Sequence, residues 1–124
     1  MKNDYASNKL SESIDKLKHS LTFENKIHHD DFYFSGIAKS FEICLEYAWK
    51  HFKRVSLIHG LEANSPREAI KNAHKLKLIN DLDLWLGFLE DRNYAVHDYL
   101  RLSMEDYLET IHSFYKAIKK LKLD

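Results

Sequence analysis

Apolar residues recur every three or four positions along almost the whole chain, and very little interrupts that spacing. Only three glycines and one proline occur among the 124 residues. These two residue types end helices most strongly, whereas the leucine, lysine, glutamate and alanine that dominate this sequence favour helices. An all-α fold is therefore predicted, with helix along nearly the entire chain.

Two long helices are predicted in the first half of the chain. The first covers about residues 7–24, and a polar stretch then breaks its apolar stripe. The second covers roughly residues 31–58, with Asp30 or Asp31 capping its start and Gly60 suited to the position just past its end. The stripes consist of Leu10, Ile14, Leu17 and Leu21 in the first helix, and of Phe34, Ile37, Phe41, Cys44, Leu45, Ala48, Phe52 and Val55 in the second.

A short third helix is predicted over about residues 66–76. Ser65 is a favourable N-cap, Pro66 occupies the first helical position, where proline is tolerated, and Glu68 completes a capping box. Together these residues form the clearest helix start in the sequence.

A fourth helix follows the connector at residues 78–81, with Asn80 or Asp81 as its cap. Gly87 lies inside this helix and lowers its stability, so it is expected to permit close approach of another helix. The apolar positions of the fourth helix are Leu82, Trp85, Leu86, Leu89 and Val96.

The last helix begins after Ser103, which is followed by Asp106 in a pattern resembling a capping box. Its apolar stripe is Met104, Leu108, Ile111, Tyr115 and Ile118, widened by Tyr107, Phe114 and Leu121. The predicted architecture is an antiparallel up-and-down four-helix bundle with one extra short helix. The length fits a single domain spanning residues 1–124.

The formal charges of the chain balance, because 19 lysines and arginines accompany 19 aspartates and glutamates. A broad basic surface for DNA or an anionic membrane is therefore not expected, and any contact with a nucleotide or RNA has to be local. The single cysteine, Cys44, excludes an internal disulfide and is expected to be buried. No secretory signal or apolar run of ~20 residues is present, so a cytoplasmic protein is expected.

A polar cluster inside an apolar frame is the main candidate for chemistry. Residues 90–99 contain Arg92, Asn93, His97 and Tyr99. At about 100° per residue on one helix, Arg92 and Tyr99 share a face, while Arg92 and His97 point about 140° apart. The arginine and histidine therefore converge only if the helix ends or bends near His97, or across a two-fold axis between protomers. An arginine stabilises phosphate charge and a histidine moves protons, so the pair suits phosphodiester chemistry; the alternative is a purely structural cluster.

Other chemistries have little support in the sequence. Gly36, Gly60 and Gly87 are isolated, so no glycine-rich phosphate loop is predicted. The run at residues 28–31, His-His-Asp-Asp, has ligand types for a divalent ion, but such adjacent residues on a polar connector are more often simply hydrated. No metal and no cofactor are expected.

The run Arg92-Asn-Tyr-Ala-Val-His97-Asp-Tyr99 resembles the R-x4-6-H motif of the HEPN domains (higher eukaryotes and prokaryotes nucleotide-binding), which are small helical bundles. More narrowly, the chain resembles the nucleotidyltransferase substrate-binding proteins. Three segments carry this resemblance over roughly residues 34–118: residues 40–50, residues 64–69 with Leu78-Ile79, and the stretch from Trp85 to Tyr99.

The resemblance implies a homodimer that pairs with a minimal nucleotidyltransferase, often as a toxin–antitoxin system. Some relatives of this kind are metal-independent ribonucleases, which would make Arg92, His97 and Asn93 catalytic. Others carry R-x4-H-x-Y and receive AMP from the transferase on the tyrosine, which corresponds to Tyr99.

Three hypotheses follow from the sequence. The first is a partner that binds the nucleotidyltransferase and presents either a nucleotide or Tyr99 to it. The second is a ribonuclease toxin that uses Arg92 and His97. The third is a structural helical dimer without catalysis.

Overall fold

The computed structural model describes residues 5–97 and 103–121, with side chains placed for residues 8–95 and 103–121. Within these ranges the only regular secondary structure is helical, which confirms the predicted all-α fold. In chain order they are α1 (Tyr5–Leu21), the short 3₁₀ helix η1 (Glu24–Lys26), α2 (Asp31–Ile58), α3 (Pro66–Lys75), α4 (Leu82–His97) and α5 (Met104–Ile118).

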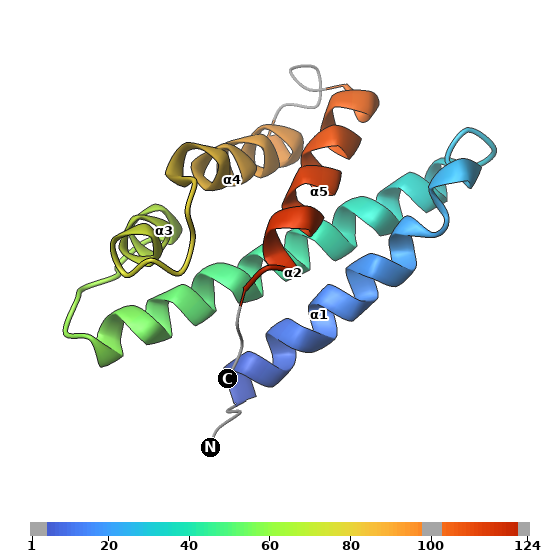
Figure 1. The fold of residues 1–124 in the computed structure, drawn as a ribbon. Helices are drawn as coiled ribbons and strands as arrows, with labels where there is room; N and C mark the ends of the chain where they lie inside the picture. The colour runs from blue at the N-terminus through green and yellow to red at the C-terminus, as the bar shows by residue number, and fades with distance from the viewer. Residues whose placement is uncertain (1–4, 98–102, 122–124) are drawn as a thin grey trace.

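Helix α2 is the central element, and it runs the length of the molecule (Figure 1). Helix α1 lies antiparallel along its first part and α3 packs against its second part, while α5 contacts both α1 and α2. The directions of α1, α2, α4 and α5 alternate, and α3 is the extra short helix (Figure 1). The predicted up-and-down bundle is therefore confirmed.

Local capping explains where the two ends of α2 lie. The N–H of Phe32 donates to the Asp30 carboxylate at 2.9 Å, so Asp30 is the cap. At the other end Gly60 has φ +77°, and the N–H groups of Gly60 and Leu61 donate to the carbonyls of Leu57 and Ser56 at 3.1 and 2.9 Å. This pair of bonds is a Schellman motif, which needs a residue in the left-handed conformation.

Serine and aspartate side chains cap the three later helices as their sequence predicts. Ser65 Oγ accepts from the N–H of Glu68 at 3.1 Å at the start of α3. Asp81 Oδ1 accepts from the N–H of Leu84 at 3.0 Å, so Asp81 rather than Asn80 caps α4. Ser103 Oγ accepts from the N–H of Asp106 at 3.1 Å and caps α5.

The first helix ends earlier than the predicted residue 24. Helix α1 stops at Leu21, because the N–H and hydroxyl of Thr22 both donate to the carbonyl of His19, at 3.0 and 2.6 Å. This tightened turn leads into η1, which the apolar spacing did not indicate. Side-chain competition for a backbone carbonyl thus outweighs the continuing helical pattern.

Six aromatic rings form the centre of the core. Phe114 of α5 is fully buried and lies edge-on to Phe41, Phe88 and Trp85, with ring centroids 5.1, 5.4 and 5.7 Å away. Phe52 contacts Trp85 at 5.3 Å, and Tyr107 contacts Phe41 at 5.5 Å. Edge-to-face rings of this kind hold α2, α4 and α5 together.

Two sequence predictions about single residues have different outcomes. Cys44 is fully buried, as predicted, and desolvation by that burial raises the pKa of its thiol to about 12. The expectation for Gly87 is wrong, because a Cβ added there would meet nothing within 4 Å. Gly87 therefore mediates no close helix contact among the described residues.

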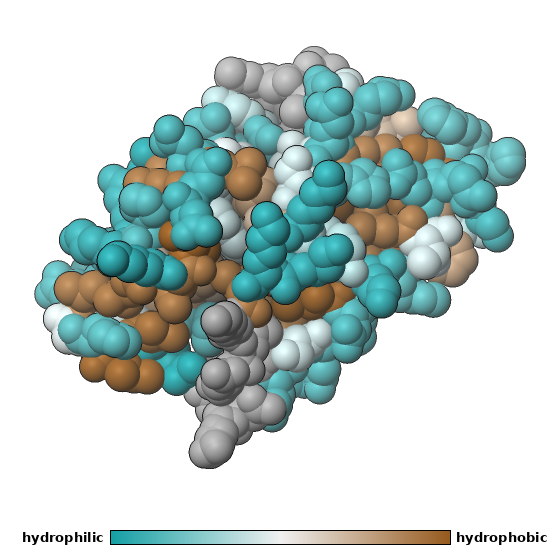
Figure 2. Space-filling view, viewed as in Figure 1, coloured by the Kyte–Doolittle hydropathy of each residue, from teal (hydrophilic) through white to brown (hydrophobic). Residues whose placement is uncertain are grey.

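On the face shown in Figure 2, hydrophilic and hydrophobic residues are interspersed. Leu57 and Ile58 are exposed at the C-terminal end of α2. No helix in residues 5–97 and 103–121 is both long and apolar enough to cross a membrane.

Candidate functional site

The polar residues of the motif on helix α4 face two different neighbours. Trp85, Phe88 and Ala95 are buried and fix the rotation of the helix against the core. Asp91 faces α5, where its carboxylate accepts from the Thr110 hydroxyl at 2.6 Å. Arg92 is half-buried and faces away from α5 into a groove shared with α2 and α3.

This groove, named here the α2–α3–α4 groove, encloses about 520 Å³. Its volume falls within the range of small-molecule sites, which is roughly 300–1,000 Å³. Its lining residues are Glu42, Leu45, Glu46 and Trp49 from α2, Ser65, Pro66 and Arg67 at the start of α3, and Leu86, Leu89, Glu90, Arg92 and Asn93 from α4.

Parts of all three sequence segments that carry the family resemblance line this groove, although Leu78 and Ile79 of the second segment do not. Residues 40–50 supply its α2 wall, residues 64–69 supply the start of α3, and the stretch that begins at Trp85 supplies the α4 wall. Segments that are separated in the sequence therefore build one site, because α3 packs against both α2 and α4 and the Phe52 ring of α2 contacts Trp85 of α4.

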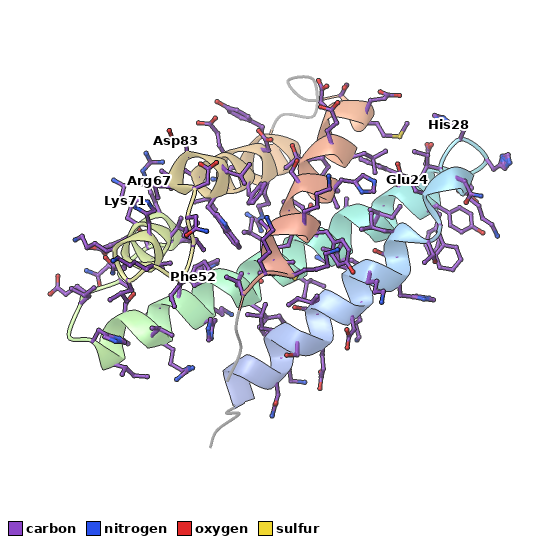
Figure 3. The ribbon with its side chains drawn as sticks, viewed as in Figure 1. Glu24, His28, Phe52, Arg67, Lys71 and Asp83 are labelled. Carbon is purple, nitrogen blue, oxygen red and sulfur yellow. The ribbon has the colours of Figure 1, made fainter. Side chains whose placement is uncertain are left out.

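Two arginines supply the positive charge of the groove. Arg67 is exposed on α3, where Figure 3 also labels Lys71, and Arg92 is half-buried on α4. In the part of the chain with placed side chains, neither guanidinium forms an ion pair, and Arg92 makes only a long contact of 3.4 Å to Asn93 Oδ1. Both guanidinium groups therefore keep donors for an anionic ligand.

Carboxylates and one aromatic ring complete the lining of the groove. Glu46 pairs with Lys50 at 3.1 Å, and Glu42 accepts from the Tyr107 hydroxyl at 3.4 Å. Trp49 is half-buried, so part of its indole is accessible. The arrangement offers cations, acceptors and a flat apolar surface within one concave site.

The predicted site residues are only partly described. Arg92 and Asn93 line the groove together, whereas His97 is the last residue of α4 and its side chain lies outside the described part. Helix α4 continues without a break from Arg92 to His97, so these two positions stay about 140° apart around it. Tyr99 lies outside the described residues, and its role stays a prediction.

Sequence reasoning missed Trp49, Arg67 and Glu46 as site residues. All three lie in segments that support the resemblance, but nothing local distinguishes them from other surface residues. Only the packing of α2 against α3 and α4 places them beside Arg92.

One of the candidate metal ligands at residues 28–31, Asp30, is a helix cap. The Asp30 carboxylate caps α2, and His28, His29 and Asp31 are exposed. Across residues 8–95 and 103–121, no three histidine, cysteine or acidic side chains gather as a metal site.

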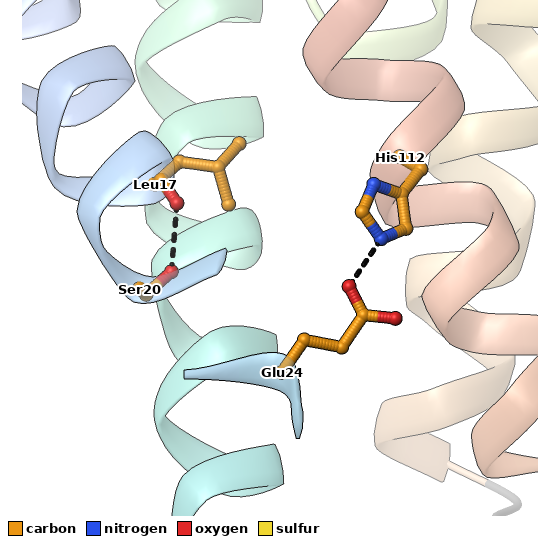
Figure 4. A network of polar contacts seen from close by, with 4 residues as sticks. All are labelled: Leu17, Ser20, Glu24 and His112. Carbon is orange, nitrogen blue, oxygen red and sulfur yellow. Dashed lines mark hydrogen bonds and ion pairs between the residues drawn. The ribbon is translucent and has the colours of Figure 1, made fainter. Parts of the chain in front are cut away.

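A second cleft, of about 940 Å³, lies between η1 and α5. His112 Nε2 and Glu24 Oε1 are 2.5 Å apart across it, while Ser20 donates to the Leu17 carbonyl nearby (Figure 4). The contact joins residues 88 positions apart in the sequence, so no local pattern indicates it. It attaches the η1 turn to α5.

Comparison with known families matches residues 5–124 to the family described as nucleotidyltransferase substrate binding protein like. The chain belongs to this family. The match covers every element of the structure, including all three walls of the α2–α3–α4 groove. No curated protein matches the chain.

Proposed function

We propose that this protein is the substrate-binding partner of a minimal nucleotidyltransferase, and that the α2–α3–α4 groove receives the nucleotide or substrate. The observation that carries the proposal is the convergence of Arg67, Arg92 and Trp49 on one groove. The family description names substrate binding for a nucleotidyltransferase.

The groove has a complementary group for each part of a nucleotide. Guanidinium groups bind phosphate oxygens by paired N–H donors, which suits Arg67 and Arg92. An accessible indole stacks on a base, which suits Trp49. Hydroxyl and amino groups of the ligand find acceptors in the carboxylates of Glu46 and Glu90.

Titration calorimetry with ATP tests this proposal. Arg92→Ala and Arg67→Ala are each expected to weaken binding by about tenfold or more, since a charge-assisted hydrogen bond contributes roughly 1.5–3 kcal/mol. Lys71→Ala is the matched control, because Lys71 is an exposed cation of the same helix that does not line the groove. Equal weakening by all three substitutions would indicate general electrostatic attraction and contradict a site.

A finer version of this function makes Tyr99 the acceptor of AMP, within a toxin–antitoxin pair. It is supported by the family membership and by the position of Tyr99 two residues after the end of α4 in the sequence. Co-expression with the transferase followed by intact-mass measurement is expected to show one added AMP that Tyr99→Phe abolishes. An unchanged mass in the presence of an active transferase contradicts this version.

The alternative function is a metal-independent ribonuclease of HEPN type. Helical geometry places Arg92 and His97 on different faces of α4, so the active site would combine Arg92 of one protomer with His97 of the partner subunit in a homodimer. Arg92 would stabilise the phosphate, Asn93 would orient it, and His97 would act as general acid and base.

A complementation assay tests the composite site. Arg92→Ala and His97→Ala are each expected to be inactive on RNA, while a mixture of the two regains part of the activity because a heterodimer contains one intact site. RNA cleavage by either single variant excludes the mutated residue from the mechanism.

A further inference from the structure

A third concave site, separate from both the α2–α3–α4 groove and the cleft at η1, lies between the later part of α1 and the first part of α2, which run side by side (Figure 1). It encloses about 500 Å³. We name it the α1–α2 groove; it is lined by Lys16, His19, Ser20 and Phe23 on one side and by Phe32, Tyr33, Gly36, Ile37 and Ser40 on the other. Phe32 is 75% exposed, which is unusual for a phenylalanine at the edge of an apolar groove.

A row of residues along α2 gives the groove its shape. Phe32, Gly36 and Ser40 are spaced four apart and therefore lie in line on the helix. Gly36 leaves the middle of this row open, because an added Cβ would meet nothing within 4 Å. The row from Phe32 to Ser40 is about 12 Å long, which matches two turns of a docked helix.

Aromatic side chains form the wall beside this row. Phe23 and Tyr33 are stacked with ring centroids 5.8 Å apart, and Phe32 lies edge-on to Tyr33 at 6.5 Å. The exposed Phe32 ring thus contacts Tyr33, which in turn stacks on Phe23. A partly preformed aromatic pocket of this kind is typical of an anchor site in protein–protein interfaces.

The residues that line the groove include basic side chains and no acidic one. Lys16 and His19 line it, and the Lys26 ammonium lies 5.7 Å from the centroids of both Phe23 and Tyr33. The carboxylates of Asp30 and Asp31 lie at the start of α2 and do not line the groove. A ligand with apolar residues on one face and acidic residues beside them complements this surface.

We propose that the α1–α2 groove docks an acidic amphipathic helix of a partner protein. The inference rests on the proposed function in taking that partner to be the nucleotidyltransferase. A second copy of this chain fits less well, because facing grooves in a symmetric dimer would bring Lys16 and His19 of both protomers together. In this arrangement the α1–α2 groove binds the transferase, while the α2–α3–α4 groove binds the substrate of the transferase.

Gly36→Leu is the decisive substitution. It fills the groove with a side chain, and because replacing a glycine inside a helix favours the helix, the variant is expected to fold, which its circular dichroism spectrum checks. Gly87→Leu in α4 is the matched control, since its Cβ also meets nothing within 4 Å and it lines neither groove. Phe32→Ala removes the exposed ring without filling the groove.

The assay is the dissociation constant of the full chain with its purified nucleotidyltransferase, measured by calorimetry. Phe32→Ala removes one aromatic contact and Gly36→Leu blocks the groove, so each is expected to weaken the complex roughly tenfold or more, while Gly87→Leu has no effect. Lys16→Glu is also expected to weaken the complex, and its effect on the dissociation constant should be larger at low salt than at high salt.

The contrary outcomes are distinguishable. If the wild-type chain binds the transferase and Gly36→Leu binds equally well, the docking site is refuted and the proposed function stands. If Gly36→Leu instead converts a dimer to a monomer in analytical ultracentrifugation, a second copy occupies the groove and the inference is refuted. If the wild-type chain forms no complex with the transferase, the partnership itself fails and the inference fails with it.

Discussion

Lys77 occupies a backbone conformation that suits glycine, and replacing it gives a quantitative test of how α3 ends. Its φ is 64°, and the N–H groups of Lys77 and Leu78 donate to the carbonyls of His74 and Ala73 at 3.0 and 2.9 Å. This is the same Schellman motif that Gly60 forms at the end of α2, with a lysine where α2 has glycine.

The expected effect of Lys77→Gly is a gain of about 0.5–1 kcal/mol in the free energy of unfolding. The left-handed conformation destabilises a residue with a Cβ by roughly 1–2 kcal/mol, and glycine avoids this strain. Glycine loses more conformational entropy on folding, which offsets about 0.5–1 kcal/mol of that gain. For a chain of 124 residues this corresponds to a rise of about 2–4 °C in the melting temperature.

Thermal and urea unfolding followed by circular dichroism measure this change. Lys77→Ala is the matched control, because alanine removes the long side chain but keeps the left-handed strain, so its stability should stay close to that of the wild type. Gly60→Ala is the reverse change and is expected to lower stability by about 1 kcal/mol. If Lys77→Gly is no more stable than Lys77→Ala, the conformational account of this helix end is wrong.

Three further substitutions test the core and the fixing of α4. Burial raises the pKa of the Cys44 thiol to about 12 in the folded protein, from 9.0 for an unperturbed thiol, so on raising the pH the thiol of the unfolded chain ionises first. Above pH 9 the wild type should therefore lose about 1.4 kcal/mol of stability per pH unit relative to Cys44→Ala. Parallel plots of stability against pH for the two proteins would contradict this. Phe114→Ala should cost about 3–5 kcal/mol in urea unfolding, because it removes the ring that contacts Phe41, Phe88 and Trp85. Thr110→Val should cost about 1–2 kcal/mol in the same assay, since it removes the donor to the part-buried Asp91 carboxylate; a cost near zero would show that solvent replaces this bond.

The ends of most helices follow from the sequence because their causes are local. Ser65, Asp81 and Ser103 each cap the helix that begins just after them, and the bond spans only three residues. The end of α1 departs from its pattern for an equally local reason, since Thr22 competes for the carbonyl of His19. Apolar periodicity alone does not include such side-chain competition.

The candidate site is harder to predict, because it depends on how helices rotate against one another. The sequence indicates Arg92 and Asn93, but Trp49 and Arg67 join them only when α2 and α3 pack beside α4. The contact between His112 and Glu24 likewise has no local sign in the sequence. His97 and Tyr99 remain predictions from the sequence and from the family resemblance.

The central claim is that the α2–α3–α4 groove binds a nucleotide, and the two tryptophans of the chain offer a direct measurement. Trp49 lines the groove, whereas Trp85 is 3% exposed in the aromatic core. The two indole N–H signals in a ¹H–¹⁵N correlation spectrum are therefore an internal pair of probe and reference. Addition of ATP is expected to shift the Trp49 signal in a saturable manner, to leave the Trp85 signal in place, and to have a much weaker effect in Arg92→Ala. A Trp49 signal that stays unchanged at saturating ATP would contradict the claim.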